Sequence, residues 1–126
     1  MSSITRAISP EVSEPQPGTW SNCLVVNGVA YLAGMTAPGE DEYAQATAIF
    51  TKMRHLVEAA GGSMADIVKV TIFVTDIKQR EKVWKARQEY FTGNFPASTL
   101  VQVAALATPA LKVEIESVAH IGASRR

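Results

Sequence analysis

Hydrophobic and polar residues alternate along the chain in a pattern that predicts strands near both ends and helices in between. The apolar run at 24–26 leads into Asn27-Gly28, and a second apolar run returns over 29–33. Asn-Gly between two apolar runs is the sequence pair most typical of a two-residue hairpin turn. We therefore predict a β-hairpin in the first third of the chain.

Two amphipathic helices are predicted after this hairpin. The first follows a polar loop at 36–42 and stops at Gly61-Gly62, which supplies the left-handed conformation that ends many helices. Its apolar positions recur at helical spacing: Ala46, Ile49, Phe50, Met53, Leu56, Val57 and Ala60. The second helix is predicted over 78–92, with Asp76 as its N-cap and Gly93 at its end.

Three further strands are predicted at 67–75, 99–106 and 112–121. In the first of them we expect one face to carry Val68, Val70, Ile72 and Val74. The order β-β-α-β-α-β-β defines an α+β fold, and its helix-length crossovers require parallel pairing in part of the sheet. Two helices cover only one face of such a sheet, so the other face is expected to meet solvent or other subunits.

Composition and charge narrow the class of protein. The 126 residues, 47% apolar and 19% charged, fit one globular domain spanning 1–126, with an extended proline-containing arm at 1–16 and a tail at 122–126. A formal net charge of 0 disfavours nucleic-acid binding, and no apolar run is long enough to span a bilayer. One cysteine and two histidines cannot form a standard zinc site. We expect a cytoplasmic protein without metal, nucleic-acid or membrane partners.

The last strand offers the clearest candidate for chemistry. Glu114 and Glu116 project from the same face, about 6 to 7 Å apart, and could act as acid or base or simply form a solvated face. Other candidates also have plain interpretations. Cys23 is expected to be a buried, inert thiol, His55 solvated and His120 structural. No nucleophile-elbow, P-loop or dinucleotide motif is present.

Several segments together resemble the RidA/YjgF family of enamine/imine deaminases, some of which carry the older label endoribonuclease L-PSP. The segments that carry the resemblance are Pro17-Gly18-Thr19-Trp20-Ser21, Tyr31-Leu32-Ala33-Gly34-Met35, Val57-Glu58-Ala59-Ala60-Gly61, Asp66-Ile67-Val68-Lys69-Val70-Thr71, Val74-Thr75-Asp76, Phe95-Pro96-Ala97 and Lys112-Val113-Glu114-Ile115-Glu116. The resemblance implies a chorismate-mutase-like domain that forms homotrimers, with pockets at the subunit interfaces. It also implies no metal or organic cofactor.

The resemblance places the family's functional positions on particular residues of this chain. It implies that Glu114 handles the attacking water, with the Thr99 hydroxyl beside it. The arginine that clamps the substrate carboxylate in the family corresponds here to Ser98. The remaining pocket positions correspond to Trp20, Ala33, Gly34, Met35, Trp84 and Leu100.

Loss of the clamp has a large expected effect. Hydrogen bonds to a charged group contribute roughly 1.5 to 3 kcal/mol each, so a bidentate clamp corresponds to about 10² to 10⁴ in affinity or rate. Either another cation such as Arg87 takes over, or the ligand lacks that carboxylate. The substitutions to Trp20, Ala33, Met35, Trp84 and Leu100 favour a more apolar ligand.

Two functions follow as expectations. The first is a hydrolase of enamines or imines more apolar than the small imino acids, with water held by Glu114 and Thr99 and ammonia released. The alternative is a catalytically inactive trimeric module that binds a small molecule or a partner protein at its interfaces. Zero net charge and the lack of a positioned histidine pair disfavour RNA cleavage.

Overall fold

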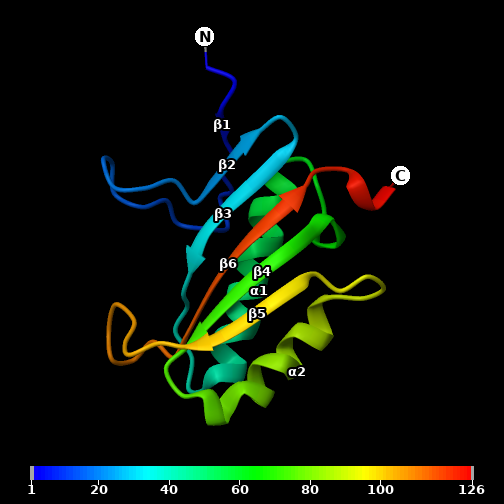
Figure 1. Cartoon of the computed structure of the whole chain (residues 1–126). Helices are drawn as coiled ribbons and strands as arrows, with labels where there is room; N and C mark the ends of the chain where they lie inside the picture. Colours follow the sequence, from blue (N-terminus) through cyan, green and yellow to red (C-terminus); the bar gives the residue numbers. More distant parts are fainter. Residues whose placement is uncertain (1, 126) are drawn as a thin grey trace.

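A computed structural model describes residues 2–125, in which one six-stranded mixed sheet carries two helices on a single face (Figure 1). Met1 and Arg126, the ends of the predicted arm and tail, lie outside the described residues. The elements are β1 (Thr5–Arg6), β2 (Cys23–Val26), β3 (Val29–Met35), α1 (Glu42–Ala59), η1 (Met64–Asp66), β4 (Ile67–Val74), η2 (Ile77–Gln79), α2 (Arg80–Tyr90), β5 (Ala97–Gln102), β6 (Val113–His120) and η3 (Ala123–Arg125). The strand order is β1-β2-β3-β6-β4-β5, and the α+β fold is confirmed.

The predicted hairpin is β2–β3, paired antiparallel from Cys23↔Leu32 to Val26↔Val29. Asn27 and Gly28 have φ values of 53° and 76°, the left-handed pair that a primed two-residue turn requires. The predicted parallel pairing is also present, between β4 and β5.

The arm holds a strand that the sequence pattern did not reveal. Residues Thr5 and Arg6 pair antiparallel with β2, and the Ala7 amide donates to the Cys23 carbonyl at 3.0 Å. Two residues are too few for alternating hydrophobicity to be recognised. The arm is therefore partly an edge strand of the sheet.

Two predicted boundaries are corrected by the structure. Strand β5 begins at Ala97 and ends at Gln102, not at residue 106, because the Val103 amide donates to Val74, the last residue of its partner β4. Asp76 caps the short turn η2, accepting from the Lys78 amide at 3.1 Å, and the regular helix α2 begins only at Arg80.

The prediction that Val68 shares a face with Val70 is wrong. Val68 is 42% exposed, whereas Ile67 is 2% exposed and takes the inward position. The pairing of β4 with β6 shifts register between Ile67 and Lys69, and such a bulge reverses the alternation of the residues before it. The remaining inward residues of β4 are buried as predicted.

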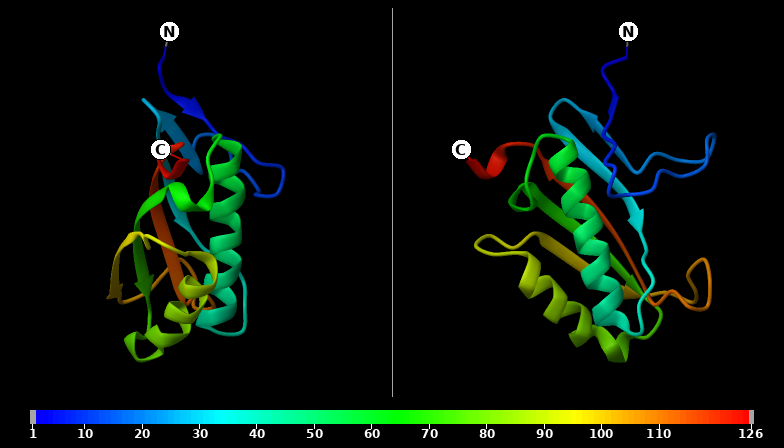
Figure 2. Two further views of the ribbon diagram at one scale, coloured as in Figure 1. Left: turned by 90° about the vertical axis from the view of Figure 1, so that its right-hand side faces the viewer. Right: turned by 180° about the vertical axis from the view of Figure 1, so that it is seen from behind.

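Both helices pack on the same side of the sheet, as the views from the side and from behind show (Figure 2). Helix α1 contributes much of the core, including Ile49, Phe50 and Met53, and Phe50 packs edge-on against Phe91 with ring centroids 5.5 Å apart. No helix formed by the described residues lies over the opposite face, and apolar side chains such as Tyr31 and Val101 are exposed there. None of the helices described over 2–125 combines the length and apolar character that a membrane crossing needs.

Two buried polar side chains fasten loops to this core. The Gln45 amide nitrogen donates to the carbonyls of Gly39 and Ala110, at 3.1 and 2.9 Å, and its oxygen accepts from the Lys112 amide at 2.8 Å. Both ends of this side chain are thus satisfied, as a buried amide requires.

Asp66 fastens the C-terminal turn in the same way. Its carboxylate is 1% exposed and accepts from the backbone amides of Ser63, Gly122 and Ser124 at 2.9 to 3.0 Å. Burial alone would raise the pKa of Asp66, but the hydrogen bonds from Ser124, Gly122 and Ser63 outweigh it and hold this pKa well below its usual range.

We predict that Asp66→Asn lowers the free energy of unfolding by about 1 to 3 kcal/mol at pH 7, because an amide cannot accept all of these bonds and its NH₂ faces donors. A depressed folded pKa gives stability that is present above the unfolded pKa, about 3.9, and is lost as pH falls toward the folded value. The difference in free energy of unfolding between wild type and variant, measured by urea unfolding, should therefore become smaller below about pH 4. Asp76→Asn, at an exposed cap, is the control. A gap that is zero at pH 7, or unchanged by acid, would contradict this assignment.

Candidate functional site

The geometry around Glu114 is set by a bulge in the neighbouring strand. Glu114 lies between the fully buried Val113 and Ile115, so its side chain points to the uncovered face. Across from it, the pairing passes from Leu32↔Ser117 to Met35↔Ile115, which leaves one extra residue in β3. The bulge therefore consists of Ala33 and Gly34.

The Glu114 carboxylate lies directly over Gly34. A Cβ atom added to Gly34 would lie 3.0 Å from the Glu114 Cδ and closer still to its Oε2. Any other residue here would displace the carboxylate, which is the kind of close approach for which glycine is used. We call Ala33, Gly34 and Glu114 the bulge half-site.

Trp20 belongs to the loop that leads into β2 and is bonded to this bulge. The Ala33 amide donates to the Asn22 carbonyl at 2.8 Å, which ties the loop to the bulge two residues after Trp20. The Trp20 side chain is 58% exposed. An exposed indole beside a polar hollow is available to a ligand or to another chain.

A second group of predicted residues gathers on α2 and β5. An Nη atom of Arg87 donates to Ser98 Oγ at 2.9 Å, in a hollow of about 360 Å³ that Gln88, Phe95 and Pro96 also line. The Arg87 guanidinium carbon lies 6.0 Å from the centre of the Trp84 ring. We call Trp84, Arg87 and Ser98 the guanidinium half-site.

This arrangement concerns the two alternatives for the missing clamp, which were another cation such as Arg87 or a ligand without the carboxylate. Ser98 occupies the position that the resemblance gives to the carboxylate-clamping arginine, and a guanidinium does lie beside it. Partial burial lowers the pKa of Arg87 from its ordinary value, but an arginine stays charged at any physiological pH. The replacement cation expected from α2 therefore lies within hydrogen-bond distance of Ser98.

Two predicted pocket residues face the core. The Met35 side chain is 4% exposed and buried among core residues, so it cannot line an open pocket. The bulge before it turns Met35 toward the helices. Leu100 pairs with the buried Ile72 and packs partly against the core, on the same side of the sheet as Ser98.

Thr99 does not join Glu114 within one chain. Its hydroxyl accepts from the Lys69 ammonium group at 3.1 Å on the uncovered face. Strand β4 lies between β5 and β6, so two strand spacings, about 10 Å, separate their backbones. Within one chain Glu114 and Thr99 therefore do not share a water, and the predicted pairing of these two residues requires a cleft between chains.

The two half-sites lie on opposite sides of the sheet. Ser98 pairs with Val70, which is buried beneath the helices, whereas Glu114 points to the uncovered face. Directly paired residues project from the same face of a sheet, so Ser98 and Arg87 lie on the helix side. One chain therefore presents two halves of the predicted site without bringing them together.

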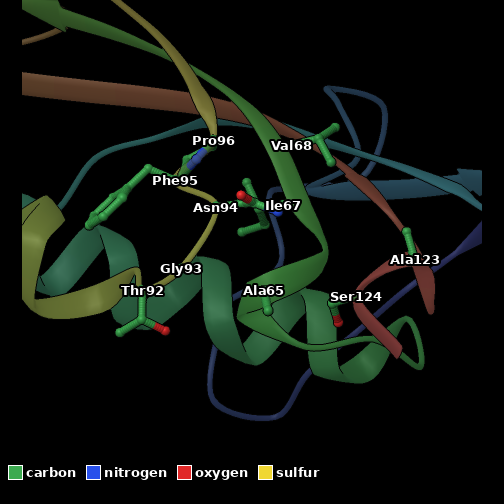
Figure 3. A pocket seen from close by; sticks show the side chains of 10 residues that line it. All are labelled: Ala65, Ile67, Val68, Thr92, Gly93, Asn94, Phe95, Pro96, Ala123 and Ser124. Atoms are coloured by element: carbon green, nitrogen blue, oxygen red, sulfur yellow. The ribbon is translucent and has the colours of Figure 1, made fainter. Parts of the chain in front are cut away.

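Figure 3 shows a separate pocket of about 420 Å³. None of its lining residues is titratable: Ala65, Ile67, Val68, Thr92, Gly93, Asn94, Phe95, Pro96, Ala123 and Ser124. It shares Phe95 and Pro96 with the hollow around Arg87. This pocket can hold an apolar group but offers no acid or base of its own.

The other candidates keep the plain interpretations. His120 is exposed, and His55 is partly exposed on α1. Within the described part of the chain, no group of three or more His, Cys, Asp or Glu side chains is arranged to hold a metal ion. Lys69 was not predicted as a site residue. Its contact with Thr99 depends on the parallel register of β4 and β5, which a strand pattern does not specify.

Known proteins are similar to this chain in sequence and in fold. The family profile described as Endoribonuclease L-PSP matches residues 12–121. A protein of Dermatophagoides farinae named 2-iminobutanoate/2-iminopropanoate deaminase is 38% identical over 119 residues, covering 85% of this chain and 90% of the relative. A crystal structure of a protein of unknown function from Pseudomonas aeruginosa superposes with a TM-score of 0.89 at 34% identity, covering 97% of this chain and 95% of that one. RidA from Psychrobacter sp. gives 0.84 at 30% identity, with 93% and 100% covered.

Cys23 should be unreactive in the folded protein. Its side chain is fully buried, and burial raises the pKa of the thiol to about 11, so the reactive thiolate is scarce at pH 8. We predict slow labelling by a thiol-specific disulfide reagent at pH 8, and complete labelling in denaturant. Labelling of the native protein as fast as that of free cysteine would contradict this prediction.

Proposed function

The chain belongs to the RidA/YjgF family, also called the endoribonuclease L-PSP family, and from this we propose that it hydrolyses imines and enamines with release of ammonia. The observation that carries the proposal is the Glu114 carboxylate, placed over Gly34 on the uncovered face. The name of the mite relative, an imine deaminase, supports the same chemistry.

In the proposed reaction Glu114 acts first as a base and then as an acid. An enamine is converted to its imine by protonation at carbon, and water adds to the imine carbon while Glu114 takes a proton from it. The resulting carbinolamine receives that proton on nitrogen. Glu114 then takes the proton of the carbinolamine hydroxyl and passes it to the amino group as the C–N bond breaks, which gives a carbonyl compound and ammonia and leaves the carboxylate in its starting state. A hydroxyl in the role expected of Thr99 would come from another copy of the chain.

We further propose that the complete site forms between copies in a homotrimer. The opposite placement of the two half-sites supports this, because facing copies can bring Glu114 of one to Arg87 of the next. The exposed apolar residues Tyr31 and Val101 on the uncovered face also favour a covering partner.

The substrate we propose is bulkier and more apolar than the smallest imino acids. Trp20 and Trp84 are large, partly exposed indoles at predicted pocket positions, and Ala33 has no hydroxyl to offer. Such walls favour an apolar substituent because they remove its surface from water without hydrogen-bonding it.

We predict that Glu114→Gln lowers the rate of ammonia release by about 10² to 10⁴, because general acid–base catalysis by a positioned side chain contributes that much. The rate is measured with freshly generated 2-aminoacrylate and with bulkier imines. Glu116→Gln is the matched control, because Glu116 carries the same charge on the same face of β6 and should retain most of the activity. Wild-type rates equal to buffer with every imine would favour the inactive binding module instead, and a fully active Glu114→Gln variant would remove Glu114 from the proposed reaction.

A mixing experiment tests whether each site draws on two chains. Glu114→Gln removes the base, and Ser98→Trp fills the hollow beside Arg87, so each variant alone should be inactive. The two variants are unfolded, mixed in equal amounts and refolded together. The chain that supplies Glu114 to a site then has the intact glutamate in one half of cases, and the chain that supplies the hollow has it intact in one half of cases. About one quarter of wild-type activity should then return. No recovery, with a mixed oligomer demonstrated by native mass spectrometry, would place the whole site in one chain.

A further inference from the structure

Arg87 carries a charge that the described residues do not neutralise. The ion pairs found among residues 2–125 join Arg6 to Glu14 and Lys82 to Asp41, and neither involves Arg87. The Arg87 side chain is nevertheless partly buried, in the hollow beside Phe95 and Pro96. A partly buried cation without a counter-ion is costly unless a ligand supplies the anion.

The guanidinium is also held in a defined place. Arg80, Trp84 and Arg87 follow one face of α2, and the two guanidinium carbons lie 5.6 and 6.0 Å from the centre of the Trp84 ring. The bond to Ser98 at 2.9 Å uses one of the five N–H donors of Arg87. The remaining N–H donors of Arg87 are available to a ligand. The contacts with Trp84 and Ser98 fix the orientation of the guanidinium plane that carries these donors.

Ser98 can contribute a second donor to the same ligand. Its oxygen accepts from Arg87, which leaves its own O–H free to donate. A guanidinium N–H and a hydroxyl side by side match the two oxygens of a carboxylate. Phe95 and Pro96 continue from this point to the uncharged pocket of Figure 3, which suits an apolar substituent.

We propose that Arg87, oriented by Trp84 and assisted by Ser98, binds the substrate carboxylate, so that in this chain the anion contact comes from helix α2 instead of strand β5. This inference rests on the proposed function, and it narrows the substrate class to 2-imino carboxylates with apolar side chains. Neutral imines of the same shape are then poor substrates. Trp84 is a positioning residue in this arrangement.

Direct binding tests the proposal without turnover. The probes are 2-oxobutanoate and 4-methyl-2-oxopentanoate, which have the carboxylate of the proposed products, and their neutral amides, measured by isothermal titration. The wild type should prefer each acid over its amide, and Arg87→Met should lose that preference by about 10² to 10³ in affinity for the acid. Arg54→Met is the matched control, because Arg54 also lies over an aromatic ring, Tyr90, at a distance of 5.8 Å. The control should bind as wild type does.

Moving the charge back to the strand tests its position. The double variant Arg87→Ser with Ser98→Arg should recover most of the preference for the acid that Arg87→Ser alone loses. Trp84→Leu should weaken acid binding more than amide binding and so reduce the preference for the acid, an effect that general destabilisation would not produce. Equal binding of acid and amide by the wild type, no binding of either at millimolar concentration, or an unchanged preference in Arg87→Met would overturn the proposal.

The outcomes also separate this inference from the proposed function. Acid binding that depends on Arg87, in a protein that releases no ammonia from any imine, would keep the carboxylate site and remove the deaminase. Glu114-dependent ammonia release from neutral and acidic imines alike would keep the deaminase and remove the carboxylate site.

Discussion

Strand β6 pairs with β3 on one side and β4 on the other, and its two-residue alternation controls both faces of the sheet. One set of its side chains is buried against α1, while Glu114 and Glu116 project from the opposite face. Burial of the first set is what prevents the strand from slipping, because a shift of one residue would exchange the two faces. The position of the candidate catalytic carboxylate is therefore secured by hydrophobic packing on the side of the sheet that the carboxylate does not touch.

The same one-sided architecture separates the charges of the candidate site. The sheet presents the Glu114 carboxylate on its open face, and helix α2 presents the Arg87 guanidinium beside β5 on the covered face. Strand β4 lies between β5 and the strand β6 that carries Glu114. This separation protects function in one respect. Glu114 and Arg87 of one chain cannot neutralise each other as an ion pair, which would raise the cost of releasing either group to a ligand. Assembly of copies, as proposed, would bring the two charges near one substrate only when the site is complete.

Much of this could be predicted from the sequence, and the failures have identifiable causes. The hairpin at Asn27-Gly28 and the alternation in β6 are local patterns, and both are confirmed. The prediction for Val68 is wrong because this residue lies beside a bulge, and a bulge is set by pairing with another strand. The resemblance placed Met35 in the pocket, but the bulge in β3 turns its side chain toward the core. The contact of Arg87 with Ser98 joins a helix to a strand 11 residues away, and only the way α2 packs beside β5 determines it.

The short strand β1 has a consequence for how copies of the chain can meet. It covers the outer edge of β2 with two paired residues and then leaves the sheet, ending the ladder with the bond from Ala7 to Cys23. A strand of this length presents too few free backbone groups to template continuous strand addition, which is how open edges give rise to fibres. Strand addition at this edge of the sheet is therefore disfavoured by the pairing of Thr5 and Arg6 with β2.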